Sequence, residues 1–242
     1  MEELLKSLLP YIRTIFGAVT TNTVEFLGSG FLLRKSTEIF LCTAAHVSDR
    51  FRASYPLFID GIDGGLVPLV GLINSSPTSK PCIRDDDIID LSIVTLDRSI
   101  HHRLNAVPMI ELNNVDFGKE CNYDRGFLAL GYPINMNKKA IDRKLITPYP
   151  YAFHALEASN DTYQNIRVAK DTHIILKFNK RRVYSNEQVM RTAPDLNGLS
   201  GAPIWGLNRE KEPKVVGVLI EHHKGSLNVV IGTRLKFDFK NI

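Results

Sequence analysis

Apolar residues recur through most of the chain in short runs, and residues that favour turns separate these runs. Short apolar runs bounded by Gly, Asn, Asp, Ser or Pro predict β-strands. The turn signals include Asp63-Gly64-Gly65 and Lys224-Gly225-Ser226. The predicted strands are 24–33, 39–43, 57–59, 66–73, 91–96, 127–130, 172–178, 215–220 and 227–231. Many short strands at close intervals favour an all-β barrel or sandwich.

The N-terminal segment has a different pattern. Between residues 2 and 16 the large aliphatic residues recur at roughly helical spacing, at Leu4, Leu5, Leu8, Leu9, Ile12 and Ile15. Pro10 interrupts this pattern, because a proline inside a helix removes a hydrogen bond and clashes with the preceding turn. We therefore expect a short N-terminal helix that Pro10 bends or ends.

Three short motifs contain residues suited to catalysis. They are Thr43-Ala44-Ala45-His46, Asp90-Leu91-Ser92-Ile93-Val94 and Gly198-Leu199-Ser200-Gly201-Ala202-Pro203. A serine hydroxyl is a poor nucleophile until a base takes its proton, and an acid must in turn orient that base. His46, Asp90 and Ser200 can supply these three roles, which indicates acyl-transfer chemistry.

The aspartate role has several candidates in one segment. Asp85, Asp86 and Asp87 precede the apolar run and are typical of an exposed turn. Asp90 is followed directly by the predicted strand 91–96, where a buried carboxylate must have a partner. We therefore assign the role to Asp90, with Asp87 as its competitor.

The order His46, Asp90, Ser200 and the residues around them resemble the trypsin-like (chymotrypsin-fold) serine peptidases. Within that group the chain resembles bacterial stand-alone trypsin-like domain proteins and HtrA-type proteases more than digestive enzymes. The segments that carry the resemblance are 28–33, 40–47, 88–96, 128–133, 198–203 and 215–220. The resemblance implies an all-β fold of two six-stranded antiparallel barrels, with the active site in the cleft between them.

The resemblance also implies how the chain is divided. Residues 112–124 look like a linker, so 1–118 would form the N-terminal helix and first barrel, with His46 and Asp90. Residues 119–242 would form the second barrel, with Ser200 and an elaborated insertion at about 134–194. Basic residues and tyrosines are interspersed in this insertion. They would form either a surface for a substrate or acidic partner, or the solvated face of a loop and hairpin.

Carried over to this sequence, the resemblance implies a serine endopeptidase that works through an acyl-enzyme without a cofactor. His46 would be the general base and acid, Asp90 would orient its ring, and Ser200 would be the nucleophile. The backbone N–H groups of Gly198 and Ser200 would form the oxyanion hole. Glycine suits position 198, because this turn must aim an N–H inward and tolerate unusual backbone angles.

Two departures from digestive trypsin concern activation and specificity. Leu199 stands where trypsin-like zymogens carry an aspartate that pairs with a new N-terminus, so activation by cleavage is not expected. Pro194 stands where trypsin has its acidic pocket floor. Asp195 and Glu221 would either supply negative charge to the cleft or be solvated and ion-paired. The candidate substrate-binding residues are Pro194, Asp195, Ile220, Glu221 and His222.

Composition favours a reducing compartment. The 242-residue chain has three cysteines, at 42, 82 and 121, without a C-x-x-C motif. A secreted protease of this size usually carries paired cysteines. Glu2 and Glu3 stand where a secretory signal would be basic, and no apolar run approaches the ~18 residues of a membrane span. We expect a cytoplasmic protein, bacterial by resemblance.

The expected partners are a protein substrate and an activating or regulatory protein. A net charge of +4 gives no argument for nucleic acid. His101-His102 and His222-His223 lack the i, i+4 spacing of a helical zinc site, so no metal is expected.

The biological role has more than one interpretation. The resemblance suggests a stress or anti-phage defence effector that cleaves one particular protein. The rival interpretation is a catalytically latent protease-fold module that binds a partner. An esterase fits less well, because Ala202 breaks the G-x-S-x-G motif.

Overall fold

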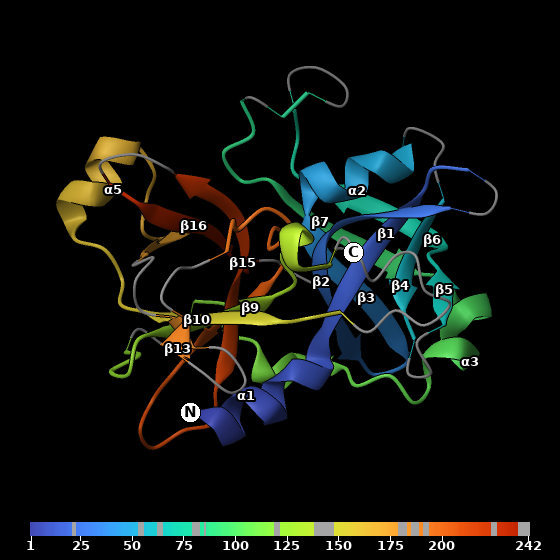
Figure 1. Cartoon of the computed structure of the whole chain (residues 1–242), viewed down its shortest axis with the longest axis horizontal. Helices are drawn as coiled ribbons and strands as arrows, with labels where there is room; N and C mark the ends of the chain where they lie inside the picture. The colour runs from blue at the N-terminus through green and yellow to red at the C-terminus, as the bar shows by residue number, and fades with distance from the viewer. Residues whose placement is uncertain are drawn as a thin grey trace.

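Two mainly antiparallel β-sheets, built from successive halves of the chain, lie side by side in the computed structural model (Figure 1). The structure describes residues 1–20, 23–52, 56–61, 65–78, 83–84, 86–118, 122–137, 148–178, 183–184, 189–190, 194–223 and 227–236. The strands of the first sheet are β1 (Ile12–Ala18), β2 (Val24–Lys35), β3 (Glu38–Ala44), β4 (Leu57–Asp60), β5 (Leu66–Pro68), β6 (Gly71–Ser75), β7 (Leu91–Leu96) and β8 (Ile110–Glu111). Those of the second are β9 (Phe127–Gly131), β10 (Tyr151–Ala155), β11 (His173–Lys177), β12 (Val183–Tyr184), β13 (Val189–Met190), β14 (Pro203–Gly206), β15 (Lys214–His223) and β16 (Val229–Arg234). The α-helices are α1 (Glu2–Leu8), α2 (Ala45–Arg52), α3 (His101–Leu104), α4 (Ile134–Asn137) and α5 (Asn160–Ile166).

The first sheet closes into a six-stranded barrel through one bent strand. Its order is β5-β4-β1-β2-β3-β7-β6, and its two edges, β5 and β6, are consecutive in the chain. The residues between them continue the pairing on both sides, because Leu69 donates to the Leu57 carbonyl and Val70 accepts from the Asp97 N–H. At the bend, a Cβ added to Gly71 would lie 2.1 Å from the Thr95 carbonyl oxygen. Glycine therefore permits the close backbone approach that closes this barrel.

The second sheet closes in a similar way. Its order is β11-β16-β15-β14-β9-β10-β12-β13. Beyond β10 the chain turns and pairs with β11, since Ala158 donates to the Ile175 carbonyl and Lys177 donates to the Leu156 carbonyl. This pairing joins the two strands into a ring of β9, β10, β11, β16, β15 and β14, and the β12–β13 hairpin lies outside it. The predicted fold of two six-stranded antiparallel barrels is confirmed.

The N-terminal segment only partly follows its helical spacing. The short helix α1 is present and ends at Leu8, and a 3₁₀ turn over Leu9–Tyr11, which contains Pro10, follows it. The continuation of the helical pattern through Ile12 and Ile15 was misleading, because both residues lie on β1 with 0% exposure. Strand β1 pairs with β2 and β4 and is buried on both faces, so it lacks the alternation that marks a half-exposed strand.

The segment expected to be an insertion supplies two strands of the second barrel, β10 and β11. Helix α5 lies between them, at the left edge of the molecule (Figure 1). The basic side chains of this segment fall largely outside the described residues, and Lys177 is exposed at the end of β11. The expected basic surface therefore stays a prediction, as does the barrel boundary at residues 112–124.

One apolar cluster continues from the first barrel into the second. It contains Phe31 and Phe40 from the first barrel and Leu130, Trp205 and Val215 from the second. Burial of continuous apolar surface fixes how the two barrels pack, and therefore where their loops meet. Among the described residues, no helix is long and apolar enough to cross a membrane.

Candidate active site

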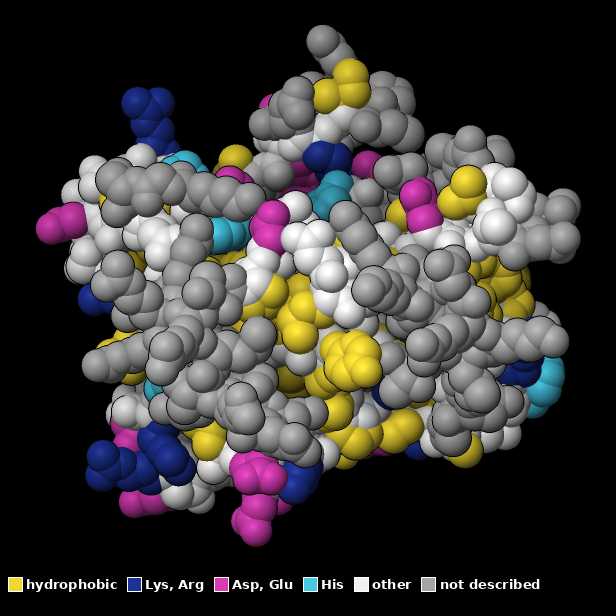
Figure 2. All heavy atoms as spheres, in the orientation of Figure 1, with side chains coloured by type: hydrophobic (Ala, Val, Ile, Leu, Met, Phe, Trp, Pro, Cys, Tyr) yellow, Lys and Arg dark blue, Asp and Glu magenta, His cyan; other side chains and the backbone are white. Residues whose placement is uncertain are grey.

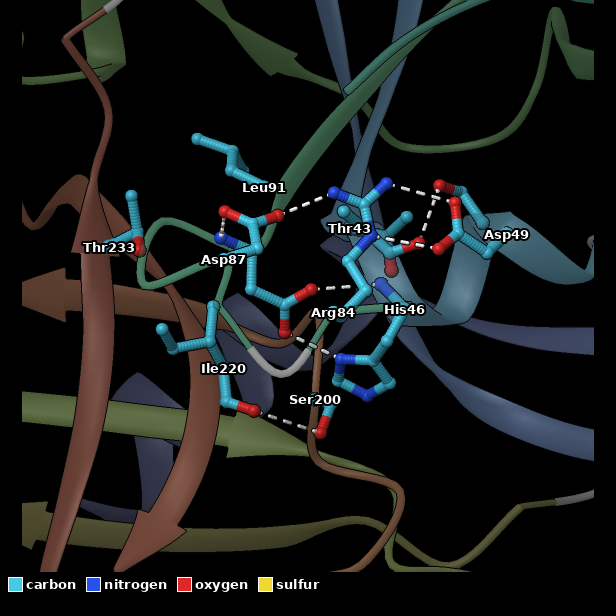
Figure 3. Close-up of polar contacts among 12 residues, drawn as sticks. Thr43, His46, Asp49, Arg84, Asp87, Leu91, Ser200, Ile220 and Thr233 are labelled. Atoms are coloured by element: carbon cyan, nitrogen blue, oxygen red, sulfur yellow. Dashed lines mark hydrogen bonds and ion pairs between the residues drawn. The ribbon is translucent and has the colours of Figure 1, made fainter. Parts of the chain in front are cut away.

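His46 and Asp90 meet at the edge of the first barrel. His46 is the second residue of α2, and Asp90 directly precedes β7. The ring Nδ1 of His46 lies 2.6 Å from Asp90 Oδ2, and the backbone N–H of His46 donates to Oδ1 at 2.9 Å (Figure 3). The Asp90 side chain is 12% exposed and that of His46 is 42% exposed. A carboxylate that accepts from Nδ1–H leaves Nε2 of this partly exposed ring as a proton acceptor.

The backbone at Asp90 has a left-handed conformation, with φ of 43°. Aspartate tolerates this region better than most residues, and surrounding contacts must hold it there. The Asp90 carbonyl accepts from Ala45 N–H at 2.9 Å. Asp87 Oδ1 accepts from the N–H groups of Ile89 at 3.1 Å and Asp90 at 2.9 Å. Asp87 therefore shapes the turn that presents Asp90.

This role corrects the expectation that Asp87 lies in an exposed turn. Its side chain is 3% exposed, and it pairs with Arg84, which is 10% exposed. Asp86 is exposed as expected, and Asp85 lies outside the described residues. Burial favours a higher pKa for the Asp87 carboxyl, but hydrogen bonds from Ser76, the Asp90 amide and Arg84 outweigh it and lower that pKa. Asp87 is thus held ionised behind the turn.

Arg84 also reaches α2. Its Nε and Nη2 atoms bind the two carboxylate oxygens of Asp49 at 2.8 and 2.9 Å, a bidentate pair. Figure 3 shows Arg84 lying between Asp49 and Asp87. Hydrogen bonds from Arg84 to Asp49 act against the effect of burial and, with those to Asp87, raise the pKa of the guanidinium. The helix that carries His46 and the turn that carries Asp90 are thereby joined through one guanidinium.

Two side chains of the second barrel hold the other side of the same turn. Thr233 on β16 donates to the Ile89 carbonyl at 2.5 Å. His173 on β11, which is 0% exposed, lies with Nε2 2.7 Å from the Ile88 carbonyl. A carbonyl can only accept, so Nε2 of His173 carries the proton. The aspartate turn is therefore a point of contact between the two barrels.

Ser200 lies in a loop shaped by glycines. Gly198 has a φ of 94° and Gly201 a φ of 90°. A Cβ at Gly201 would lie 1.9 Å from the Ser29 carbonyl oxygen, and one at Gly198 would lie 2.7 Å from atoms of Ile134 and Phe26. Glycine is required at both positions, because side chains disfavour these angles and have no room there.

The same loop leaves two backbone donors available. Within the described residues, the N–H groups of Gly198 and Ser200 make no hydrogen bond, whereas that of Leu199 donates to Leu196 at 3.0 Å. The Asn197 carbonyl accepts from the N–H of Ile134 at 2.8 Å, which orients the peptide between residues 197 and 198. In a trans peptide the N–H opposes the carbonyl, so the Gly198 N–H points away from Ile134. Two such donors suit stabilisation of a developing oxyanion.

The serine loop and α2 converge on Gly28 in β2. A Cβ on Gly28 would lie 2.8 Å from a methyl of Val47, next to His46, and 3.0 Å from the Ser200 carbonyl oxygen. The Ser200 hydroxyl donates to the Ile220 carbonyl at 3.4 Å (Figure 3). No hydrogen bond joins it to His46 among the described residues. The structure therefore brings the three predicted residues to one site, with the serine hydroxyl turned toward β15.

The predicted substrate-binding residues are only partly drawn together. Ile220 contacts Ser200 through its carbonyl. Glu221 is exposed on β15, with its carboxylate 3.6 Å from His223, and the His222 ring packs edge-on against Phe178 at 5.1 Å. Pro194 and Asp195 are half-buried in the loop that precedes Ser200. Their role in binding substrate stays a prediction.

Leu199 is fully buried in the core of the second barrel. The residue before Ser200 thus makes apolar contacts with the core of the second barrel. Cys42 is a buried free cysteine whose thiol pKa is raised by burial, and Cys82 and Cys121 lie outside the described residues. The described part of the chain contains no group of three or more His, Cys, Asp or Glu residues that could hold a metal.

Figure 2 shows histidine and acidic side chains close together in the upper half of the face viewed, above a central area of hydrophobic atoms. The partial exposure of His46 agrees with a site that solvent and substrate can reach.

The sequence interpretation missed the residues that support the site, namely Asp49, Ser76, Arg84, Asp87, His173 and Thr233. One local signal was present, because an aspartate often bonds backbone N–H groups two and three residues further on, as Asp87 does. The other contacts join residues far apart in the sequence and leave no local signal.

No protein-family model and no curated protein matches this sequence. Solved structures match it in fold. The VesB protease of Vibrio cholerae aligns over 96% of this chain and 62% of its own, with a TM-score of 0.56 and 14% identity. Kallikrein-related peptidase 10, in complex with Zn²⁺, aligns over 93% of this chain and 90% of its own, with a TM-score of 0.52 and 16% identity. The chain thus has the two-barrel fold of the trypsin-like serine proteases.

Proposed function

We propose that this chain is a serine endopeptidase that hydrolyses peptide bonds through an acyl-enzyme, with His46, Asp90 and Ser200 as its catalytic residues. The observation that carries the proposal is the pair of hydrogen bonds, at 2.6 and 2.9 Å, from His46 to the Asp90 carboxylate. This contact fixes the ring with Nε2 as proton acceptor, the state that a general base requires. The glycine-rich serine loop with two available N–H donors supports the same conclusion.

In the first half of the reaction, the Ser200 hydroxyl rotates from the Ile220 carbonyl toward His46. Its oxygen attacks the substrate carbonyl carbon while its proton passes to His46 Nε2. The carbonyl oxygen becomes an oxyanion that accepts from the N–H groups of Gly198 and Ser200. Asp90 stabilises the protonated ring. His46 then gives the proton to the leaving amine as the C–N bond breaks, which leaves an ester on Ser200.

In the second half, water attacks the ester carbonyl and loses a proton to His46. The oxyanion forms again in the same position. His46 returns the proton to the serine oxygen as the ester bond breaks, so the carboxylic acid product leaves and the enzyme is restored.

We also propose a regulated bacterial protease in the cytoplasm that acts on one particular protein, as a stress or anti-phage defence effector. The absence of a carboxylate at Leu199 supports control by loop ordering or by a regulatory protein. In this proposal the substrate contacts Pro194, Asp195, Ile220, Glu221 and His222.

One observation favours a second candidate function. The Ser200 hydroxyl bonds the Ile220 carbonyl, so the serine is not engaged by its base in this state. A chain held in that state would be a latent protease-fold module that binds a partner without turnover. The two candidates differ in whether Ser200 can react at all, because a protease that needs its regulatory protein would also be unreactive without it.

A fluorophosphonate probe tests the proposal, with the adduct located by mass spectrometry on the full chain. We expect labelling at Ser200 that is lost in Ser200→Ala and in His46→Ala. Ser159→Ala, which changes an exposed serine before α5, is the matched control and should label as the wild type does.

Equal labelling of the wild type and Ser200→Ala would overturn the assignment of the nucleophile. Labelling at Ser200 that persists in His46→Ala would overturn the assignment of the base. A folded wild type without any adduct would indicate either a protease that awaits its regulatory protein or the latent module, and an experimental structure of the 197–200 loop would then distinguish the two.

A further inference from the structure

The aspartate turn and helix α2 are joined by three buried ionic side chains, here named the clamp: Asp49, Arg84 and Asp87. Asp49 lies three residues after His46 on α2, and Asp87 lies three residues before Asp90. Arg84 binds both carboxylates, at 2.8 and 2.9 Å to Asp49 and at 2.5 Å to Asp87. The contacts run from His46 along α2, through Arg84 and Asp87, to Asp90 and back to His46 (Figure 3).

The clamp forms hydrogen bonds with the backbone at Ile89 and Asp90, and this backbone sets the position of the Asp90 carboxylate. Asp87 accepts from the N–H of Asp90 and of Ile89, and the Ser76 hydroxyl, which donates to Asp87, accepts from the N–H of Leu91. Asp90 itself has a φ of 43°, a conformation that aspartate adopts at a cost and keeps only where its surroundings hold it. The clamp provides those surroundings.

The three charged side chains of the clamp are shielded from solvent, which distinguishes the clamp from a surface ion pair. The side chains of Asp49, Arg84 and Asp87 are 10%, 10% and 3% exposed. Taking charged groups out of water offsets most of the attraction between them, so such a group is a poor source of stability compared with apolar packing. Its fixed geometry, in contrast, is well suited to holding two elements in register, because the guanidinium presents its donors in a rigid fork.

We propose that the clamp is a positioning unit that holds His46 and Asp90 in their productive arrangement before substrate binds. None of its three residues touches the reacting atoms, and all three act through Asp90 and α2. The inference rests on the proposed function, since positioning matters to the rate only if His46 and Asp90 act in catalysis.

The first test measures the rate of fluorophosphonate inactivation at saturating probe and the probe concentration for half-maximal rate. Asp87→Asn keeps an acceptor for the turn but places an NH₂ group against Arg84. We expect its saturating rate to fall on the order of 10- to 100-fold while the half-saturating concentration stays within about twofold, because geometry and not binding is disturbed. Arg84→Lys keeps the charge without the fork, and we expect a smaller loss.

Two variants serve as matched controls. Asp86→Asn removes the exposed carboxylate next to Asp87, and Arg209→Lys changes an arginine that is 78% exposed and paired with Asp124. Both should react as the wild type does. An equal loss in Asp86→Asn and Asp87→Asn would overturn the proposal, as would a rate within twofold of the wild type in folded Asp87→Asn.

The second test does not require activity. In a Ser200→Ala background, the proton on Nδ1 of His46 that binds Asp90 should give a low-field ¹H NMR resonance. We expect this resonance to shift or broaden in Asp87→Asn and in Arg84→Lys, and to stay in place in Asp86→Asn. If it stays unchanged in the folded clamp variants, the clamp does not position the pair, even where their rate has fallen.

The two tests separate failure of the inference from failure of the proposed function. A wild type that does not label at Ser200 counts against the proposed function, while the resonance still tests the clamp. If Asp87→Asn does not fold, the inactivation rate and the NMR resonance are measured on Arg84→Lys and Ser76→Ala instead. Each of these variants keeps the three charges of the clamp.

Discussion

Two residues of the candidate site have left-handed backbone conformations, Asp90 with φ of 43° and Gly198 with φ of 94°. At Asp90 the side chains of neighbouring residues hold the conformation. At Gly198 the lack of a Cβ permits it, because a side chain would collide with Ile134 and Phe26. The residue proposed to orient His46 and one proposed oxyanion donor are thus placed by the backbone before substrate arrives.

Gly198→Ala should therefore disrupt the site. The added methyl would lie 2.7 Å from Ile134 and Phe26, so the loop must shift and misdirect the N–H of residue 198. Loss of one oxyanion donor lowers the rate by about 10²- to 10³-fold in acyl-transfer enzymes. We expect a loss of that size in the rate of Ser200 labelling.

Gly118→Ala is the matched control. Gly118 also has a positive φ, 87°, but its Cβ would meet only the flexible Lys236 side chain at 3.2 Å. This variant carries a similar backbone cost away from Ser200, and its labelling rate should stay within about twofold of the wild type. Equal losses in the two variants would indicate general destabilisation in place of a lost oxyanion donor.

At the scale of elements, the clamp joins α2 to the turn before β7 through residues that are 35 positions apart in the chain. The hydrogen bonds from Ser76 and Asp90 to Asp87 are stronger when its carboxylate is ionised, which gives this junction a pH dependence.

The pKa of Asp87 is lowered from its usual value of 3.8 by these hydrogen bonds and by Arg84, against the opposing effect of burial. Because the pKa is lower in the folded than in the unfolded chain, the ionised form stabilises the fold. This stabilisation is complete above a pH of about 5 and is lost as the pH falls through the lowered pKa. In urea unfolding, the difference in unfolding free energy between wild type and Asp87→Asn should be large at pH 6 and smaller at pH 3.

The control for this measurement is Asp86→Asn, which changes an exposed carboxylate. Its unfolding free energy should follow that of the wild type at both pH values. A difference for Asp87→Asn that is the same at pH 6 and pH 3 would show that the carboxylate does not act through its charge.

At the scale of the whole molecule, the two barrels share an apolar core and are tied by polar contacts at the aspartate turn. Thr233 and His173 reach from the second barrel to the carbonyls of Ile89 and Ile88 in the first. The relative placement of the barrels, on which the meeting of Ser200 with His46 depends, is therefore coupled to the turn that holds Asp90.

Thr233→Val should lower the free energy of unfolding by about 0.5–1.5 kcal/mol, because it removes the buried hydroxyl that donates to the half-buried Ile89 carbonyl. Thr95→Val is the matched control, since the Thr95 hydroxyl is buried without a hydrogen-bond partner in the described part of the chain. We expect that variant to be as stable as the wild type or more stable. Chemical unfolding checks both, and equal effects of the two substitutions would contradict the inter-barrel contact.

The fold class could be predicted from the sequence because strand and turn patterns are local. The runs at β3, β7 and β15 carry their own signals. Strand β1 could not be recognised in this way, because burial on both faces removes the alternation of polar and apolar residues. Strand β10 was not recognised, because it lies in a segment whose basic residues suggested an insertion, whereas β11 falls within the predicted strand 172–178.

The sequence by itself determined the order of the motifs around His46, Asp90 and Ser200 and the strands that present them, because these depend on neighbours in the chain. Only the tertiary structure decided that Asp87 is a buried partner of Arg84, that Gly71 closes the first barrel, and that the Ser200 hydroxyl is turned toward Ile220. Each of these depends on contacts between residues far apart in sequence. Ion pairs, close backbone crossings and side-chain orientation arise only when packing brings such residues within a few ångströms, and no local pattern encodes that distance.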